Sequence, residues 1–129
     1  MARKLKIDTG GTTYAPYSPG ITVKDHIWLS GQVAVEAGAD IGSQTHAALA
    51  KVDALLAVAN SSRADLVKVT ILLSSMDDYG AVNEIYGAWL GDTMPPSRAA
   101  YEVSRLPLDA LIEIVCEAFR GSGAADSMD

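Results

Sequence analysis

Cysteine and clustered basic residues are scarce in this sequence, and each shortage excludes a class of protein. The single cysteine, Cys116, allows no internal disulfide and no metal site made of several cysteines. Ten basic residues are scattered among sixteen acidic ones, which gives a formal net charge of −6 at pH 7. Because a phosphate backbone is normally bound by a basic surface, we expect no nucleic-acid partner.

Long apolar runs are missing as well. None approaches the roughly 20 residues that a membrane span needs, so we expect no membrane partner. The N-terminal segment MARKLKIDTG is basic but is not followed by the apolar core of a signal peptide, and we expect a cytoplasmic protein. Residues 1–120 fit one domain that buries its own core. The tail GSGAADSMD, residues 121–129, has too little apolar content to pack and is predicted to be disordered.

Two segments have the three-and-four spacing of apolar residues that predicts an amphipathic helix. The first runs from residue 40 to 59, with Asp40 or Ser43 as its cap and Asn60 as its stop. The second follows the acidic residues at positions 77 and 78 and ends at Gly91. Its apolar stripe consists of Tyr79, Val82, Ile85, Tyr86 and Trp89.

Strand formers occupy the segments around these helices. Strands are predicted over residues 26–35, 65–74, 98–103 and 111–119. Gly31 interrupts the first of them, and a glycine inside a strand commonly marks a bulge or a close backbone approach. We therefore expect the backbone at Ser30 and Gly31 to be accessible to something small.

The order of these elements predicts an α+β domain in which both helices cover one face of a mixed sheet. In the last strand, the apolar residues alternate with Glu113, Val115, Glu117 and Phe119, which would point to the uncovered face. An apolar sheet face left in water normally marks an association surface, so we expect an oligomer.

Arg98 stands in the stretch PPSRAAYEVSRLP, which otherwise resembles a strand between prolines. Alternation places Arg98 and Ala100 on one face, and we expect this to be the uncovered face that carries Glu113. A guanidinium held on a strand beside a small residue can grip a carboxylate with two hydrogen bonds. A cross-strand or intersubunit salt bridge between Arg98 and Glu113 is the alternative, and the spacing leaves both open.

Several motifs together resemble the RidA/YjgF/YER057c family of imine and enamine deaminases. They are APYS near the start, LSGQ in the first predicted strand, VKVTILLSSMDDYGAVNEIYGAWL in the middle, and PPSRAAYEVSRLP with IEI at the end. The resemblance covers about residues 14–119. It implies a chorismate-mutase-like fold of the bacillus type, with a six-stranded mixed sheet and two helices on one face. It also implies a homotrimeric barrel with active sites between subunits.

The resemblance further implies the site residues and the reaction. Arg98 would bind the substrate carboxylate, and Glu113 would hold a water. The other residues expected at the site are Tyr17, Ser30, Gly31, Asn83 and Ala100. The expected reaction is the hydrolysis of reactive 2-imino or 2-enamino acids, such as 2-iminopropanoate or 2-aminoacrylate, to ammonia and a 2-keto acid. No metal or cofactor is expected, because an imine carbon is already electrophilic and positioning alone can supply much of the rate.

The sequence departs from the family pattern in three places. Ala100 stands where a cysteine is common, which puts any thiol role in doubt. Val115 stands where a second acid is common, and the segment VAVEAGAD after LSGQ is shorter than usual. We expect these departures to affect the substrate preference and not the presence of the site.

Other roles remain open for the protein and for single residues. The chain could be a pathway-specific enamine-acid deaminase, a non-catalytic trimer that binds small carboxylates, or an RNA-directed protein or chaperone. The net charge makes RNA the poorest fit. Tyr17 could be an interface aromatic and Asn83 a helix-surface residue.

The remaining candidates are expected to be structural. Arg105 is expected to pair with an acid, and Cys116 to pack in the core. His26 and His46 lack the paired spacing of a metal site.

Overall fold

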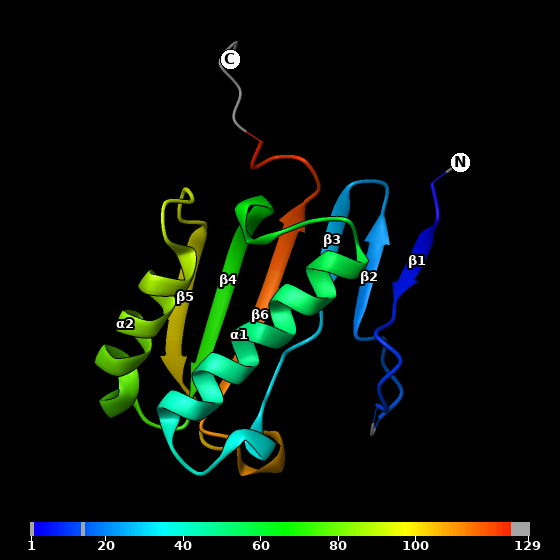
Figure 1. Cartoon of the computed structure of the whole chain (residues 1–129). Coiled ribbons are helices and arrows are strands. Elements are labelled where there is room, and N and C mark those ends of the chain that lie inside the picture. The colour runs from blue at the N-terminus through cyan, green and yellow to red at the C-terminus, as the bar shows by residue number, and fades with distance from the viewer. Residues whose placement is uncertain (1, 14, 125–129) are drawn as a thin grey trace.

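The computed structural model describes residues 2–13 and 15–124, in which six strands form one sheet and two helices pack on one of its faces (Figure 1). The strands are β1 (Lys4–Ile7), β2 (Gly20–Val23), β3 (His26–Leu29), β4 (Leu66–Leu73), β5 (Ser97–Glu102) and β6 (Ile112–Phe119). The helices are α1 (Ile41–Val58) and α2 (Tyr79–Leu90). Short 3-10 turns lie at η1 (Val35–Ala37), η2 (Arg63–Asp65), η3 (Met76–Asp78) and η4 (Pro107–Asp109).

The sheet is mixed, as the sequence predicts. Its strand order is β1-β2-β3-β6-β4-β5, in which β4 and β5 are parallel and the other neighbours are antiparallel. A parallel pair needs a crossover connection, and α2 supplies it between β4 and β5. As a result β5 is an edge strand of the sheet, with α2 packed beside it (Figure 1).

The hydrophobic core fills the layer between the helices and the sheet. The predicted stripe of α1 is buried there and includes Ala48, Leu49, Val52, Leu55 and Leu56. Asp40 caps this helix, because its carboxylate accepts a hydrogen bond from the backbone N–H of Ser43 at 2.8 Å. Gly91 ends α2 with a positive φ of 57°. Both helix predictions are confirmed to within two residues.

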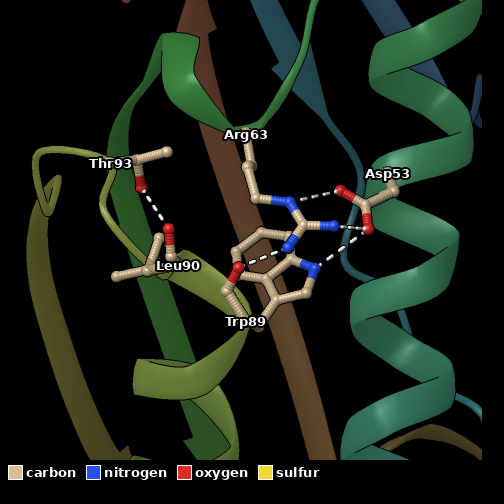
Figure 2. A network of polar contacts seen from close by, with 5 residues as sticks. All are labelled: Asp53, Arg63, Trp89, Leu90 and Thr93. Carbon is tan, nitrogen blue, oxygen red and sulfur yellow. Dashed lines mark hydrogen bonds and ion pairs between the residues drawn. The ribbon is translucent and has the colours of Figure 1, made fainter.

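A polar network holds the two helices together (Figure 2). Asp53 of α1 accepts hydrogen bonds from Arg63 Nη2 at 2.6 Å and from the indole N–H of Trp89 at 2.9 Å. Arg63 also lies over the Trp89 ring, 4.6 Å from its centroid, and donates to the Trp89 carbonyl. The network therefore joins α1, η2 and the end of α2.

The face of the sheet away from the helices carries exposed apolar side chains, and we call it the open face. Along β6 the even-numbered residues are buried and Glu113, Val115 and Glu117 lie on the open face. Large exposed apolar side chains on this face include Trp28 of β3, Tyr101 of β5 and Phe119 of β6. The predicted uncovered sheet face is confirmed.

The strand predictions are confirmed in part. The residue pattern did not predict β1 or β2, which are only four residues long. The strand predicted over 26–35 ends at Leu29, although Gln32 still forms an isolated bridge with Ile114.

The start of the predicted disordered tail is held to the domain. The backbone N–H groups of Gly121 and Gly123 donate to the Asp65 carboxylate at 3.1 and 2.8 Å. Residues 125–129 of that prediction lie outside the described residues.

None of the helices within residues 2–13 and 15–124 has both the length and the hydrophobicity that a membrane span needs.

Candidate active site

Arg98 lies on the helix-covered face of the edge strand β5. Its register partner in β4 is Val69, which is fully buried under the helices, and paired residues in neighbouring strands point to the same side. Arg98 Nη2 donates a hydrogen bond to the Tyr79 hydroxyl at 2.9 Å. The guanidinium carbon lies 5.5 Å from the ring centroid of Tyr79 and 5.1 Å from that of Tyr86. The strand and α2 together therefore determine where the cation lies.

Two further predicted residues belong to this side of the sheet. Ala100 follows Arg98 by two positions, shares its face and packs partly against the core. Asn83 is half-buried on α2, four residues after Tyr79 and three before Tyr86, so the helical period places it on their stripe. We call Arg98, Ala100, Asn83 and Tyr79 the arginine half-site.

Glu113 lies on the open face against the backbone of Gly31. A Cβ built on Gly31 would overlap the Glu113 carboxylate and lie 2.7 Å from its carboxyl carbon. The two segments are held in place because Gln32 and Ile114 exchange backbone hydrogen bonds at 2.8 and 3.0 Å. The close backbone approach predicted at Gly31 is confirmed. Burial raises the pKa of the Glu113 carboxyl above its usual value, which favours its use as a proton acceptor nearer to neutral pH.

Ser30 joins the loop that carries Tyr17 to the same region. Its hydroxyl donates to the carbonyl of Ser18 at 2.6 Å, and its backbone N–H donates to the carbonyl of Pro19 at 2.9 Å. Tyr17 precedes Ser18 and is 49% exposed, so its side chain is available to a ligand or to a partner. We call Tyr17, Ser30, Gly31 and Glu113 the glutamate half-site.

The expectation that Arg98 and Glu113 share the open face is wrong. Glu113 is paired in register with Leu72, whereas Arg98 is paired with Val69, and odd and even positions of β4 face opposite sides. Alternation separates the residues of β5 into two sets but does not say which set faces the helices. The small Ala100 allows the Arg98 set to pack under α2, where the tyrosines meet the guanidinium.

This placement excludes an ion pair between Arg98 and Glu113 of the same chain. Among residues 2–13 and 15–124, Arg98 has no carboxylate partner and its one side-chain hydrogen bond goes to Tyr79. A half-buried guanidinium of this kind can bind a carboxylate from outside the chain. The two half-sites can serve one ligand only if they come from different copies.

The contact between Tyr79 and Arg98 was not predicted. Tyr79 fits the apolar stripe of its helix, and the sequence pattern does not show that its hydroxyl reaches Arg98. Arg105 pairs with Asp109 at 2.6 Å, which confirms that it pairs with an acid.

The other structural candidates are also accounted for. His26 pairs with Glu117 at 2.6 Å and His46 is exposed on α1. Cys116 is buried, as predicted, and burial raises the pKa of its thiol to about 12. The described residues contain no group of three or more His, Cys, Asp or Glu that could hold a metal ion.

Comparison with known proteins shows which proteins this chain is similar to. Residues 11–120 match the protein family described as Endoribonuclease L-PSP. A RutC family protein of Pyrococcus horikoshii is 37% identical over 111 residues, which cover 81% of this chain and 87% of that protein. The 2-iminobutanoate/2-iminopropanoate deaminase of Mus musculus is 34% identical over 112 residues, which cover 82% of each chain. The crystal structure of Escherichia coli TdcF with bound serine superposes with a TM-score of 0.85 at 29% identity, and covers 90% of this chain and 98% of that one.

Proposed function

The chain belongs to the Endoribonuclease L-PSP family, which is also the RidA/YjgF family that its motifs resemble, and on this basis we propose that it is a reactive-intermediate deaminase. Its substrates would be 2-imino or 2-enamino acids, such as 2-iminopropanoate or 2-aminoacrylate. The products would be ammonia and the 2-keto acid. The name of the mouse relative supports this class of substrate.

The observation that carries the proposal is the state of Arg98. It is a half-buried cation with no carboxylate partner among the described residues, and it is held on a rigid strand by a tyrosine hydroxyl. Its guanidinium can form two parallel hydrogen bonds with the carboxylate that every 2-imino acid carries. A bound serine in the related TdcF is consistent with a site for small amino-acid-like carboxylates.

The glutamate half-site would carry out the hydrolysis. Glu113 would accept a proton from a water as the water oxygen adds to C2 of the imine, and would pass this proton to the nitrogen, so that the C=N double bond becomes single. The carboxylate would then accept the proton of the new hydroxyl group as the keto group forms, the nitrogen would take up that proton, and the C–N bond would break to release ammonia. An enamine acid would first accept a proton at C3 and lose one from its nitrogen, which gives the imine. The Tyr17 hydroxyl would hydrogen-bond the departing nitrogen.

The remaining residues of the two half-sites would shape the pocket. The backbone at Ser30 and Gly31 lies next to Glu113 and would contact the substrate on the water side. Ala100 shares the strand face of Arg98 and Asn83 shares the helix face of Tyr79 and Tyr86, and both would contact the substrate on the carboxylate side. No step of this hydrolysis needs a metal or a cofactor, because the enzyme positions the water and the electrophilic carbon.

A complete site would form between two copies of the chain. The arginine half-site lies on the helix side at the sheet edge, and the glutamate half-site lies on the open face. We propose a homotrimer in which the open faces pack together and each half-site meets the other half-site of a neighbour. Burial of the exposed Trp28, Tyr101 and Phe119 would stabilise such an assembly.

Release of ammonia from freshly generated 2-iminopropanoate tests the proposal. The protein is expected to accelerate hydrolysis above the spontaneous rate, and Arg98→Ala is expected to lose most of this acceleration. Removal of a charge-assisted hydrogen bond typically costs ~1.5–3 kcal/mol, which is roughly ten- to a hundredfold in rate. A wild-type protein that gives only the spontaneous rate with both 2-iminopropanoate and 2-aminoacrylate would refute this assignment.

A further inference from the structure

The guanidinium of Arg98 packs against two tyrosines of α2 that differ in one respect. Both rings lie within cation–π distance, with centroids 5.5 Å (Tyr79) and 5.1 Å (Tyr86) from the guanidinium carbon. Only the Tyr79 hydroxyl accepts a hydrogen bond from Arg98, at 2.9 Å. The Tyr86 hydroxyl is buried and has no hydrogen-bond partner among the described residues. Tyr86 therefore contacts Arg98 through its ring alone, whereas Tyr79 adds a hydrogen bond. A comparison of variants at these two positions can isolate the effect of the hydrogen bond.

The neighbours of Tyr79 restrict where its side chain can lie. It is the first residue of α2, directly after η3, whose cap residue Ser75 accepts a hydrogen bond from the Asp77 N–H at 3.1 Å. Its ring is half-buried and packs against the core. A hydroxyl carried on a packed ring directly after a capped 3-10 turn occupies nearly one position, so it can fix the group that it binds.

Fixing Arg98 matters because an arginine side chain has many rotamers. Binding a ligand to a mobile guanidinium would require these rotamers to be ordered at that moment, which weakens the affinity. The bond to Tyr79 uses one N–H of the five and sets the plane of the guanidinium before a ligand arrives. The other N–H groups have no partner among the described residues and remain available to a carboxylate.

We propose that Tyr79 is a positioning residue, whose hydroxyl holds the Arg98 guanidinium in the orientation that binds the substrate carboxylate. This inference rests on the proposed function, because it assigns Arg98 to carboxylate binding. It extends that function by naming a residue that tunes the affinity for substrate without contacting the reacting atoms.

Tyr79→Phe tests the inference, and Tyr86→Phe is its matched control. Each change removes one hydroxyl and keeps the ring, but only the first removes a hydrogen bond to Arg98. Binding of pyruvate, a stable 2-keto acid, is measured by calorimetric titration, and kcat and KM are measured with 2-iminopropanoate. Tyr79→Phe is expected to raise the Kd for pyruvate and the KM roughly three- to tenfold with kcat changed less than about twofold. Tyr86→Phe is expected to bind pyruvate as the wild type does.

A second arm asks whether the effect passes through Arg98. In an Arg98→Lys background, which lacks the planar fork, Tyr79→Phe is expected to cause little further loss of pyruvate affinity. An equal loss in both backgrounds would overturn the inference, because Tyr79 would then act independently of the guanidinium.

The outcomes separate this inference from the proposed function. If the wild type deaminates the imine and binds pyruvate, but Tyr79→Phe leaves Kd and KM unchanged, the positioning role is wrong and the deaminase assignment stands. If Tyr79→Phe lowers kcat and leaves Kd and KM unchanged, the positioning role is also wrong. If the wild type neither deaminates the imine nor binds pyruvate, both proposals fail.

Discussion

Glu113 and Gly31 show how two residues 82 positions apart in the sequence depend on each other. The carboxylate of Glu113 occupies the space that a side chain at residue 31 would fill. Gly31 does not adopt a positive φ, so the need for glycine is one of space and not of backbone conformation. The glycine thus lets the carboxylate lie against the backbone at the end of β3.

Gly31→Ala is therefore expected to displace the Glu113 carboxylate without unfolding the domain. A catalytic group misplaced by about 1 Å can cost up to ~100-fold, and we expect kcat to fall roughly ten- to a hundredfold. Steady-state kinetics measures this loss, and thermal unfolding checks the fold. Gly87→Ala is a suitable control, because a Cβ there meets nothing within 4 Å. A Gly31→Ala enzyme with wild-type kcat would show that Glu113 need not lie where it does.

The charge of Glu113 is expected to make the reaction rate depend on pH. A carboxylate accepts a proton only when ionised, and burial raises the pKa of Glu113 above its usual value. The rate should therefore rise with pH through a pKa above the ~4.3 of an unperturbed glutamate. Glu113→Gln is expected to lower kcat and to remove this rise, while pyruvate binding persists. If the rate depends on pH in the same way in the wild type and in Glu113→Gln, Glu113 has only a structural role. Glu84→Gln, on the exposed side of α2, is the control.

At the scale of elements, the end of the sheet is held by one buried carboxylate. Asp65 in η2 is 7% exposed and accepts hydrogen bonds from the Ser61 hydroxyl and from two backbone N–H groups after β6, those of Gly121 and Gly123. Burial by itself raises the pKa of Asp65, but these hydrogen bonds outweigh it and lower the pKa below its usual value. The start of the C-terminal segment is thus attached to the beginning of β4.

Asp65→Asn is expected to destabilise the domain at neutral pH by ~1–3 kcal/mol, because the amide cannot accept all of these hydrogen bonds. The folded-state pKa is lowered, so the stabilisation by the charged carboxylate is present above the unfolded-state pKa, ~3.9, and is lost as pH falls through the lower folded-state value. Urea unfolding at pH 7 and at decreasing pH measures both effects. Equal stability of wild type and Asp65→Asn at pH 7 would contradict this account. Asp92→Asn, which changes an exposed residue, is the control.

The sequence predicts the long elements of this fold well and the short ones poorly. The stripes of α1 and α2, the cap at Asp40 and the stop at Gly91 are local features, and the structure confirms them. The strands β1 and β2 have four residues each, which is too short for a periodic pattern to be distinctive.

The sequence predicts which residues are candidates for the site but not how they are arranged. Alternation along β5 gives two faces without saying which one meets α2, and so the sequence could not separate Arg98 from Glu113. The close approach at Gly31 was predictable, because an interrupted strand pattern indicates it. The contact between Tyr79 and Arg98 depends on the packing of α2 on β5, which no local pattern contains.

At the scale of the whole molecule, the two half-sites and the open face together favour an assembly of several copies of the chain. One chain presents the half-buried guanidinium of Arg98 on its helix side and the half-buried carboxylate of Glu113 on its open face. The open face also exposes Trp28, Tyr101 and Phe119. A trimer that covers this face and joins half-sites of neighbouring copies would account for all three features, and sedimentation is expected to show a trimer at micromolar concentration.

Complementation between two inactive variants tests this account most directly. Arg98→Ala damages one half-site and Glu113→Gln the other, so each variant alone is expected to have little deaminase activity. The two proteins are unfolded together in equal amounts, refolded and assayed with 2-iminopropanoate. If each site takes Arg98 from one copy and Glu113 from its neighbour, random assembly restores both residues in roughly a quarter of the sites, and about a quarter of the wild-type activity is expected. A mixture that assembles but is no more active than the mean of the two separate variants would contradict a site shared between copies.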